Sequence, residues 1–157
     1  MGILPHFTEM LILPHSEKKI RERLYQVVYP LNDDQPMAAG KEEDEFDFNG
    51  HVRKNDFRIS RRIKHSDSFL PLIKGSVEET RSGSIVHLTY GLFPSTKAFL
   101  WFWLTVSAAA AIVFFLQKEY IYGTAGIAAG IFCYTVARVA FNRSLKDSRQ
   151  HILAVFG

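Results

Sequence analysis

The chain contains the stretch Ala98-Phe-Leu-Trp-Phe-Trp-Leu-Thr-Val-Ser-Ala-Ala-Ala-Ala-Ile-Val-Phe-Phe-Leu116, in which no residue carries a charge. As an α-helix, this stretch would be about 28 Å long, close to the ~30 Å thickness of the hydrocarbon core of a bilayer. A core helix of a soluble protein normally keeps a polar face, and a domain this small could not cover an apolar helix on all sides. We therefore expect residues 98–116 to form a transmembrane helix.

A second apolar run covers residues 121–141 after a connection of only four residues. Arg138 is its one charged residue, and a side chain of this length can reach the lipid headgroups from a helix that stays in the bilayer. So short a connection makes the two helices antiparallel neighbours. The sequence thus predicts a two-helix transmembrane hairpin within residues 97–143, although the average composition, 47% hydrophobic, suits a soluble protein.

Positive charge is distributed unequally around this hairpin. Lys97 precedes it and several cations follow it, whereas Lys118 is the only cation in the turn. Positive residues near membrane spans stay in the cytoplasm, so both chain ends are expected there. Residues 1–6 lack the basic start and the long apolar stretch of a secretory signal, which agrees with this orientation.

Small residues lie along both predicted spans. Gly123, Gly126 and Gly130 recur on the second span, and Ser107 and Ala111 belong to a small-residue stretch of the first. Such surfaces let helix backbones approach closely in lipid. They fit two arrangements: packing of the hairpin on itself, or contact with another copy or another membrane protein. The absence of acidic residues within the spans argues against an ion pathway.

Residues 1–96 predict a cytoplasmic α+β domain. An amphipathic helix is expected over residues 16–28, followed by an acidic linker over 32–45. The helix would cover the apolar face of an antiparallel sheet. Short apolar segments before residue 14 suit an edge strand or a segment lying on the membrane. The alternating pattern of apolar and polar residues indicates four strands, over 46–52, 57–63, 72–79 and 84–90.

Residues 144–157 predict a short basic tail helix behind the hairpin. Its apolar residues recur on one side, with Lys146 and Arg149 opposite them. Such a helix could return to the sheet or lie on the lipid surface. Both placements remain open from the sequence.

The most basic stretch is the first strand hairpin, which carries Arg58, Arg61 and Arg62. These side chains alternate between the two faces of a strand, so they form no single stripe for nucleic acid, and we expect no nucleic-acid partner. They are candidates for contact with an anionic lipid headgroup or a peptide, and a solvated sheet face is the other explanation. Further candidates of the same kind follow the hairpin: Arg143, Lys146 and Arg149.

No segment shows the residue spacing of a catalytic, cofactor or metal site. The six histidines are scattered, and the single cysteine, Cys133, excludes an intramolecular disulfide. The segment His65-Ser-Asp-Ser68 has the residue types of a hydrolase triad, but adjacent residues on a strand cannot point at one another. The acidic linker does not match a calcium loop. We expect no enzymatic activity, no cofactor and no metal.

Four sequence blocks resemble an uncharacterised family of small bacterial membrane proteins. The similarity covers roughly residues 46–116 and is most specific in the block that begins at Ser68, although Asp67 stands where asparagine is expected. The resemblance implies a β-rich domain followed by a two-helix hairpin in a bacterial inner membrane, and it implies no activity or binding residue. The blocks are Phe48-x-Gly50-x-Val52, Phe57-x-Ile59-x-Arg61-x-Ile63, Ser68-Phe-Leu-Pro71-x-Ile73-x-Gly75 and Gly83-Ser84-x-Val86.

These features predict a membrane-anchored accessory or interaction protein within a larger or homo-oligomeric assembly. Its partners would be the lipid bilayer and either itself or other membrane proteins. The alternative is a membrane-tethered sensor or effector, whose β domain binds a small molecule and whose hairpin transmits the signal. This alternative expects a pocket between sheet and helix with Arg58, Arg61 or His87 directed into it. A third class, an enzyme acting on lipid, would need acidic or histidine residues converging at the bilayer face.

Overall fold

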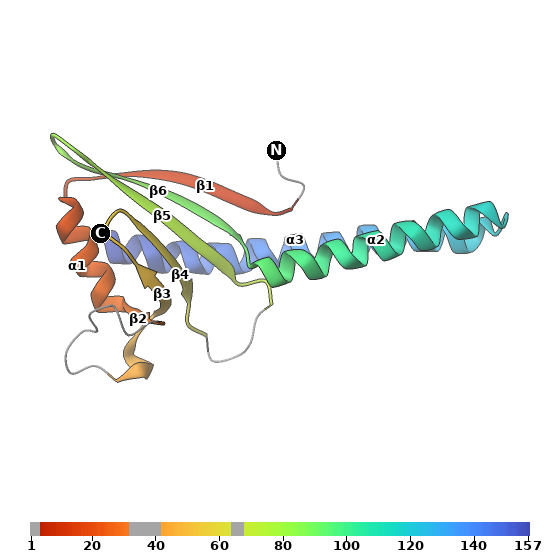
Figure 1. Ribbon diagram of the computed structural model, residues 1–157, viewed down its shortest axis with the longest axis horizontal. Coiled ribbons are helices and arrows are strands. Elements are labelled where there is room, and N and C mark those ends of the chain that lie inside the picture. The colour runs from red at the N-terminus through yellow and green to blue at the C-terminus, as the bar shows by residue number, and fades with distance from the viewer. Residues whose placement is uncertain (1–3, 32–41, 64–67) are drawn as a thin grey trace.

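A computed structural model describes residues 4–31, 42–63 and 68–157. The fold is α+β: two helical segments pack on one face of a six-stranded sheet, and a long helical hairpin projects from one end (Figure 1). The elements in chain order are β1 (His6–Leu13), α1 (Glu17–Val27), β2 (Val28–Pro30), the short 3-10 helix η1 (Glu43–Glu45), β3 (Phe48–Val52), β4 (Asp56–Arg61), β5 (Pro71–Thr80), β6 (Gly83–Leu92), α2 (Pro94–Leu116) and α3 (Tyr120–Phe156).

The predicted helix over 16–28 is α1, and the four predicted strands are β3 to β6. The sheet has two further strands, in the order β1-β6-β5-β4-β3-β2. Strand β1 pairs antiparallel with β6, and the three residues of β2 pair parallel with β3. The apolar segment at residues 10–13 therefore lies in an edge strand, one of the two possibilities left open by the sequence. Most of the predicted acidic linker, residues 32–41, lies outside the described residues.

The core lies between the sheet and the helices. Alternate residues of the strands point toward α1 and the C-terminal half of α3, as the period of two requires. Gly75 of β5 leaves the space that the ring of Phe57 occupies on the neighbouring strand, as expected for a close approach at a strand glycine. The core side chains that are fully or almost fully buried include Ile20, Leu24, Phe48, Phe57, Ile59, Ile73, Val86, Leu88, Tyr90, Phe141, Ile152 and Phe156.

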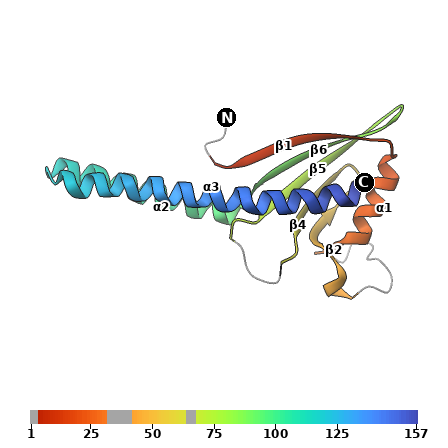
Figure 2. The same ribbon diagram turned by 180° about the vertical axis from the view of Figure 1, so that it is seen from behind.

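Helix α3 is continuous over 37 residues, about 55 Å at ~1.5 Å per residue. Its first half lies along α2, and its second half crosses the inner face of the sheet toward α1 (Figure 2). The prediction of a span over 121–141 and a separate tail helix over 144–157 is therefore wrong at the division between them. No glycine or proline occurs between Phe141 and Phe156, so nothing in the sequence stops the helix there. The tail returns to the sheet.

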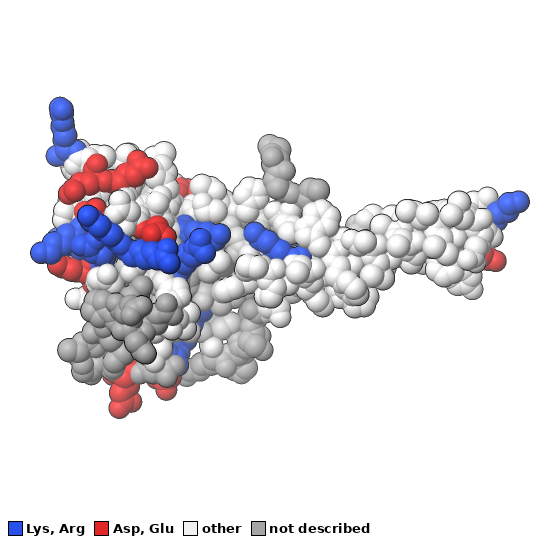
Figure 3. Space-filling model, in the orientation of Figure 1, with Lys and Arg blue, Asp and Glu red and all other residues white. Residues whose placement is uncertain are grey.

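The hairpin leaves the sheet almost directly, because only Phe93 separates β6 from α2. Both helices are long and apolar enough to cross a membrane, and only 11% of the most apolar part of α2 is buried inside the protein. Leu116 and Ile121, beside the turn, are each 80% exposed. In the view of Figure 3 the hairpin surface is free of charged side chains except at its tip, whereas the domain carries many. This surface suits a hydrocarbon environment.

Candidate functional site

The small residues of the two spans face each other inside the hairpin. A Cβ atom placed on Gly126 would lie 3.3 Å from Ala111, and one placed on Gly130 would lie 3.4 Å from the Cβ of Ser107. Beside the turn, a Cβ on Gly123 would lie 3.0 Å from the ring of Phe115. All five predicted helix-packing residues therefore belong to the α2–α3 contact, which is the first of the two arrangements left open by the sequence.

The six predicted anion contacts do not form one cluster. Three of them are engaged within the chain: Arg61 lies 3.7 Å from Asp147, Arg62 lies 3.1 Å from Asp44, and Arg149 lies 2.8 Å from Glu9. The other three are exposed, Arg58 on the outer face of β4 and Arg143 and Lys146 on α3, and Arg143 lines a small hollow together with Arg61. Charge spacing along the sequence did not reveal these ion pairs, because the acidic partners lie far away in the chain.

One of these ion pairs belongs to a polar network that fixes α3 to the sheet. The fully buried Tyr90 of β6 donates a hydrogen bond to one carboxylate oxygen of Glu9, at 2.7 Å. Arg149 of α3 donates from Nε to the other oxygen, at 2.8 Å. Burial, and secondarily the negative charge of Glu9, raises the pKa of the Tyr90 phenol above its usual range. The network connects β1, β6 and the end of α3, so it is structural.

The interface between the sheet and α3 is filled with side chains. Ile59, Leu88 and Ile152 have no exposed surface there. Arg58 and His87 lie on the opposite, outer face of the sheet, where they neighbour Lys74 and Ser76 across the strands. The pocket expected by the sensor hypothesis, with basic side chains directed into it, is not at this interface.

A hollow lies on the outer face of the sheet, at the point where the sheet meets α2. We name it the junction groove; its volume is about 630 Å³. Lys74 and Thr89 are cross-strand neighbours on its floor, and Gly91, paired with Leu72, leaves its centre open. A Cβ atom placed on Gly91 would have no neighbour within 4 Å. The remaining lining residues are Leu4, Pro5, His6, Leu92, Pro94, Lys97 and Trp101.

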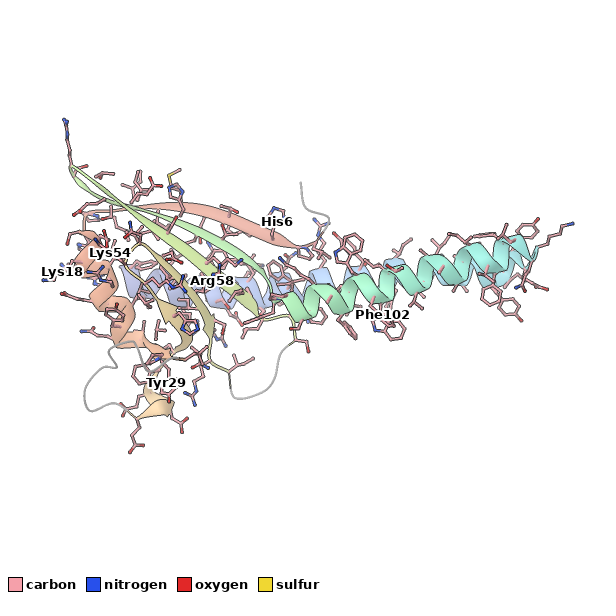
Figure 4. All side chains as sticks on the ribbon, in the orientation of Figure 1. His6, Lys18, Tyr29, Lys54, Arg58 and Phe102 are labelled. Carbon is pink, nitrogen blue, oxygen red and sulfur yellow. The ribbon has the colours of Figure 1, made fainter. Side chains whose placement is uncertain are left out.

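The sequence analysis missed the junction groove, because its residues come from four segments with no shared motif. Only the interfacial position of Lys97 and Trp101, beside the first span, could have indicated this location. Figure 4 shows His6 at the hairpin end of the domain and Lys18 and Lys54 at the opposite end. The groove combines lysine ammonium groups with apolar side chains, so it can accept a ligand that is anionic at one end and apolar at the other.

Other chemistry is sparse in the described parts of the chain. Within residues 4–31, 42–63 and 68–157, no three His, Cys, Asp or Glu side chains lie close enough together to hold a metal ion. His87 lies 3.9 Å from Glu78, and His51 is separate from this pair on β3. The residues of the triad-like segment up to Asp67 lie outside the described residues.

Comparison with known proteins gives no functional assignment. No protein-family model matches the chain, and no curated protein matches it. Similar solved structures include a Polyketide_cyc-like protein from Corynebacterium glutamicum, with 10% identity over 88% of this chain and 94% of that chain at a TM-score of 0.35. Another is a protein from Mesorhizobium loti, with 9% identity over 89% of this chain and 98% of that chain, also at 0.35. This chain is thus distantly similar to both, and their residues are not carried over to it.

Proposed function

We propose that this protein is a non-catalytic interaction protein that is anchored in the bacterial inner membrane and serves as an accessory part of a membrane assembly. The observation that carries the proposal is the continuity of α3. One uninterrupted helix is packed against α2 at Gly130 and against the sheet at Ile152. Such a helix would hold the domain at a fixed height and angle above the bilayer, which suits a protein that positions partners.

The membrane location is supported by the surface of the hairpin. Several of its large apolar side chains, among them Phe102 and Ile131, point outward and are more than half exposed. Exposure of this surface to lipid has no unfavourable free energy, whereas its exposure to water would favour aggregation. The excess of positive charge at the domain end of the hairpin favours a cytoplasmic position for the domain and both chain ends.

The interaction surfaces follow from what the fold leaves uncovered. Because Gly126 and Gly130 pack within the hairpin, the assembly would use the large outward side chains of the spans or the outer face of the sheet. No helix covers that outer face in the described part of the chain, and its strand residues are largely polar (Figure 1). The filled sheet–helix interface makes an interaction function a better fit to this geometry than a sensor with a ligand in that position.

The test is extraction in a mild detergent, followed by mass measurement of the intact particle. We expect a protein mass above the 17.9 kDa of one chain, from further copies or a second protein. A strictly monomeric particle without a partner would contradict the assembly proposal. Resistance of the membrane fraction to alkaline carbonate tests the anchor separately. Proteolysis of intact and opened spheroplasts tests the orientation, because only opened cells should expose the domain.

A further inference from the structure

The junction groove is lined by two chemically distinct kinds of side chain. Lys74 and Lys97 supply two ammonium groups, and neither forms an ion pair with a described residue. Leu4, Leu72 and Trp101 supply apolar surface beside them. Two ammonium groups without an ion-pair partner among the described residues repel each other in one hollow. A bound anion would attract both, so the hollow favours an anionic occupant. The apolar part favours an occupant that also carries hydrocarbon.

The position of the groove relative to the spans restricts the source of such an occupant. Lys97 lies in the first turn of α2, immediately before the apolar stretch, and Trp101 lies one turn further along. Tryptophan at this point of a span is typical of the headgroup level. The α2–α3 register, Ser107 opposite Gly130, places Arg138 of α3 at about the same height as Lys97. The groove therefore opens at the level of the lipid headgroups.

We propose that the junction groove binds the headgroup of an anionic phospholipid from the adjacent leaflet. Lys74 and Lys97 contact the headgroup phosphate, and Trp101 lies against the start of the acyl chains. The proposal rests on the membrane placement in the proposed function and goes beyond it by assigning a site and a ligand class. The volume of about 630 Å³ lies within the ~300–1,000 Å³ range of sites for small ligands.

Gly91 permits a test that leaves the charges unchanged. It lines the groove together with Lys74 and Lys97, and a Cβ atom there meets no neighbour within 4 Å among the residues that the structure describes. Its φ is not in the left-handed region, so a side chain is compatible with the backbone. The substitution Gly91→Phe should therefore fill the groove without displacing core residues. Gly91→Ala is its conservative counterpart and should leave most of the groove open.

The experiment reconstitutes the full chain in nanodiscs that contain equal amounts of phosphatidylcholine and phosphatidylglycerol. The lipids retained after release into mild detergent are then counted by native mass spectrometry. We expect the wild-type protein to retain phosphatidylglycerol. Lys74→Gln and Lys97→Gln should each reduce this retention about fivefold, in line with the contribution of one cation near an anionic surface. Gly91→Phe should abolish it, and Gly91→Ala should preserve it.

The matched control is the pair Lys18→Gln and Lys54→Gln, which removes the same charge at the end of the domain far from the hairpin (Figure 4). Equal losses in this control would overturn the proposal, because general surface charge would then explain binding. Unchanged retention in Gly91→Phe or in the two lysine variants would also overturn it. Displacement of phosphatidylglycerol by equimolar glycerol phosphate would identify a soluble anion as the ligand instead, and would overturn the lipid source.

Two further readouts separate a failure of this proposal from other failures. Circular dichroism of each variant establishes that the domain is folded, and Lys74→Gln and Lys97→Gln carry the test if Gly91→Phe does not fold. A chain that leaves the membrane in alkaline carbonate contradicts the proposed function itself. A chain that stays embedded but shows no preference for phosphatidylglycerol contradicts only the lipid site.

Discussion

The two halves of α3 have opposite arrangements of side chains on the same continuous helix. In the first half, small residues such as Gly126 and Gly130 face the neighbouring helix, and large apolar residues such as Ile131 point outward. In the second half, the large residues Ile152 and Phe156 face the sheet and charged residues point outward. The proposed placement of the first half in lipid and of the second half in water accounts for the reversal. In lipid, close backbone contact stabilises helix association, whereas in water the burial of large apolar side chains does so.

A charge placed on the sheet side of the second half should have the largest effect. Ile152→Asp introduces an unpaired carboxylate where no surface is exposed, which costs about 3–5 kcal/mol. We expect the domain to unfold while the hairpin remains in the membrane. Hydrogen exchange in detergent would show this as loss of protection in the strands, α1 and the second half of α3, with protection kept in the hairpin. The control is Gln150→Asp, an exposed position on the same turn, which should retain full protection.

Interruption of the helix between its halves should have the next largest effect. Arg143→Pro removes a backbone hydrogen bond and places the ring against the preceding turn, which costs about 3 kcal/mol. Both halves should persist while their fixed relative orientation is lost. Spin-label distances between the hairpin tip and β5 would broaden. Arg143→Ala should keep the narrow distribution of the wild type, and a narrow distribution in the proline variant would contradict rigid coupling through α3.

A larger side chain in the first half of α3 tests whether the contact with α2 requires small residues. Gly126→Leu would insert a side chain where a Cβ atom already lies 3.3 Å from Ala111, and we expect a loss of roughly 1–3 kcal/mol. Thermal unfolding in detergent measures the effect. Ala129→Leu provides the comparison, since this residue is exposed and a leucine there would only meet lipid. Equal stability of the two variants would exclude close packing of α2 against α3 at Gly126.

The smallest effect is expected at the polar network that joins the second half to β1. Tyr90→Phe removes one buried hydrogen bond and should cost about 1 kcal/mol at neutral pH. Because the pKa of Tyr90 is raised, the folded protein keeps this proton at a pH where the unfolded chain loses it, from about pH 10 upward.

The contribution of Tyr90 is therefore fully present below that pH and is lost as the pH rises. The stability difference between wild type and Tyr90→Phe should accordingly fall by about 1.4 kcal/mol per pH unit above about pH 10, so that it vanishes within about one unit and then changes sign. Urea unfolding at several pH values measures this difference. A difference independent of pH would show that the phenol is solvated.

The sequence was sufficient for those elements that depend on local pattern. Two helices apolar on all sides and the strong alternation around Phe57 and Ile59 required no information about distant residues. Strand β1 was left ambiguous because its pairing partner, β6, lies some seventy residues further along the chain. The division of α3 failed for a related reason. The pattern changes from apolar to amphipathic near Phe141, which resembles the end of a helix in the sequence, whereas the helix continues through it.

The candidate sites show the same limit. The helix-packing residues were found because a glycine repeat at helical spacing is itself the signal. The ion pairs of the predicted arginines could not be found from a local pattern, because Arg149 and its partner Glu9 lie 140 positions apart in the chain. The junction groove is likewise defined by contact between segments that begin at residues 4, 72, 89 and 94. Contacts between segments that lie far apart in the chain leave no local sequence pattern from which they could be predicted.

The order of elements along the chain also has a consequence for biogenesis. The strands are synthesised before the hairpin, but Phe141, Ile152 and Phe156, which close the core, are synthesised after it. On the proposed membrane placement, the apolar face of the sheet therefore stays uncovered until the chain has crossed the bilayer and returned. A chain that crosses only once would leave these three residues on the far side, and its domain could not close. Completion of the fold thus works as a check on membrane topology, and chains with the wrong number of crossings would be exposed to proteases.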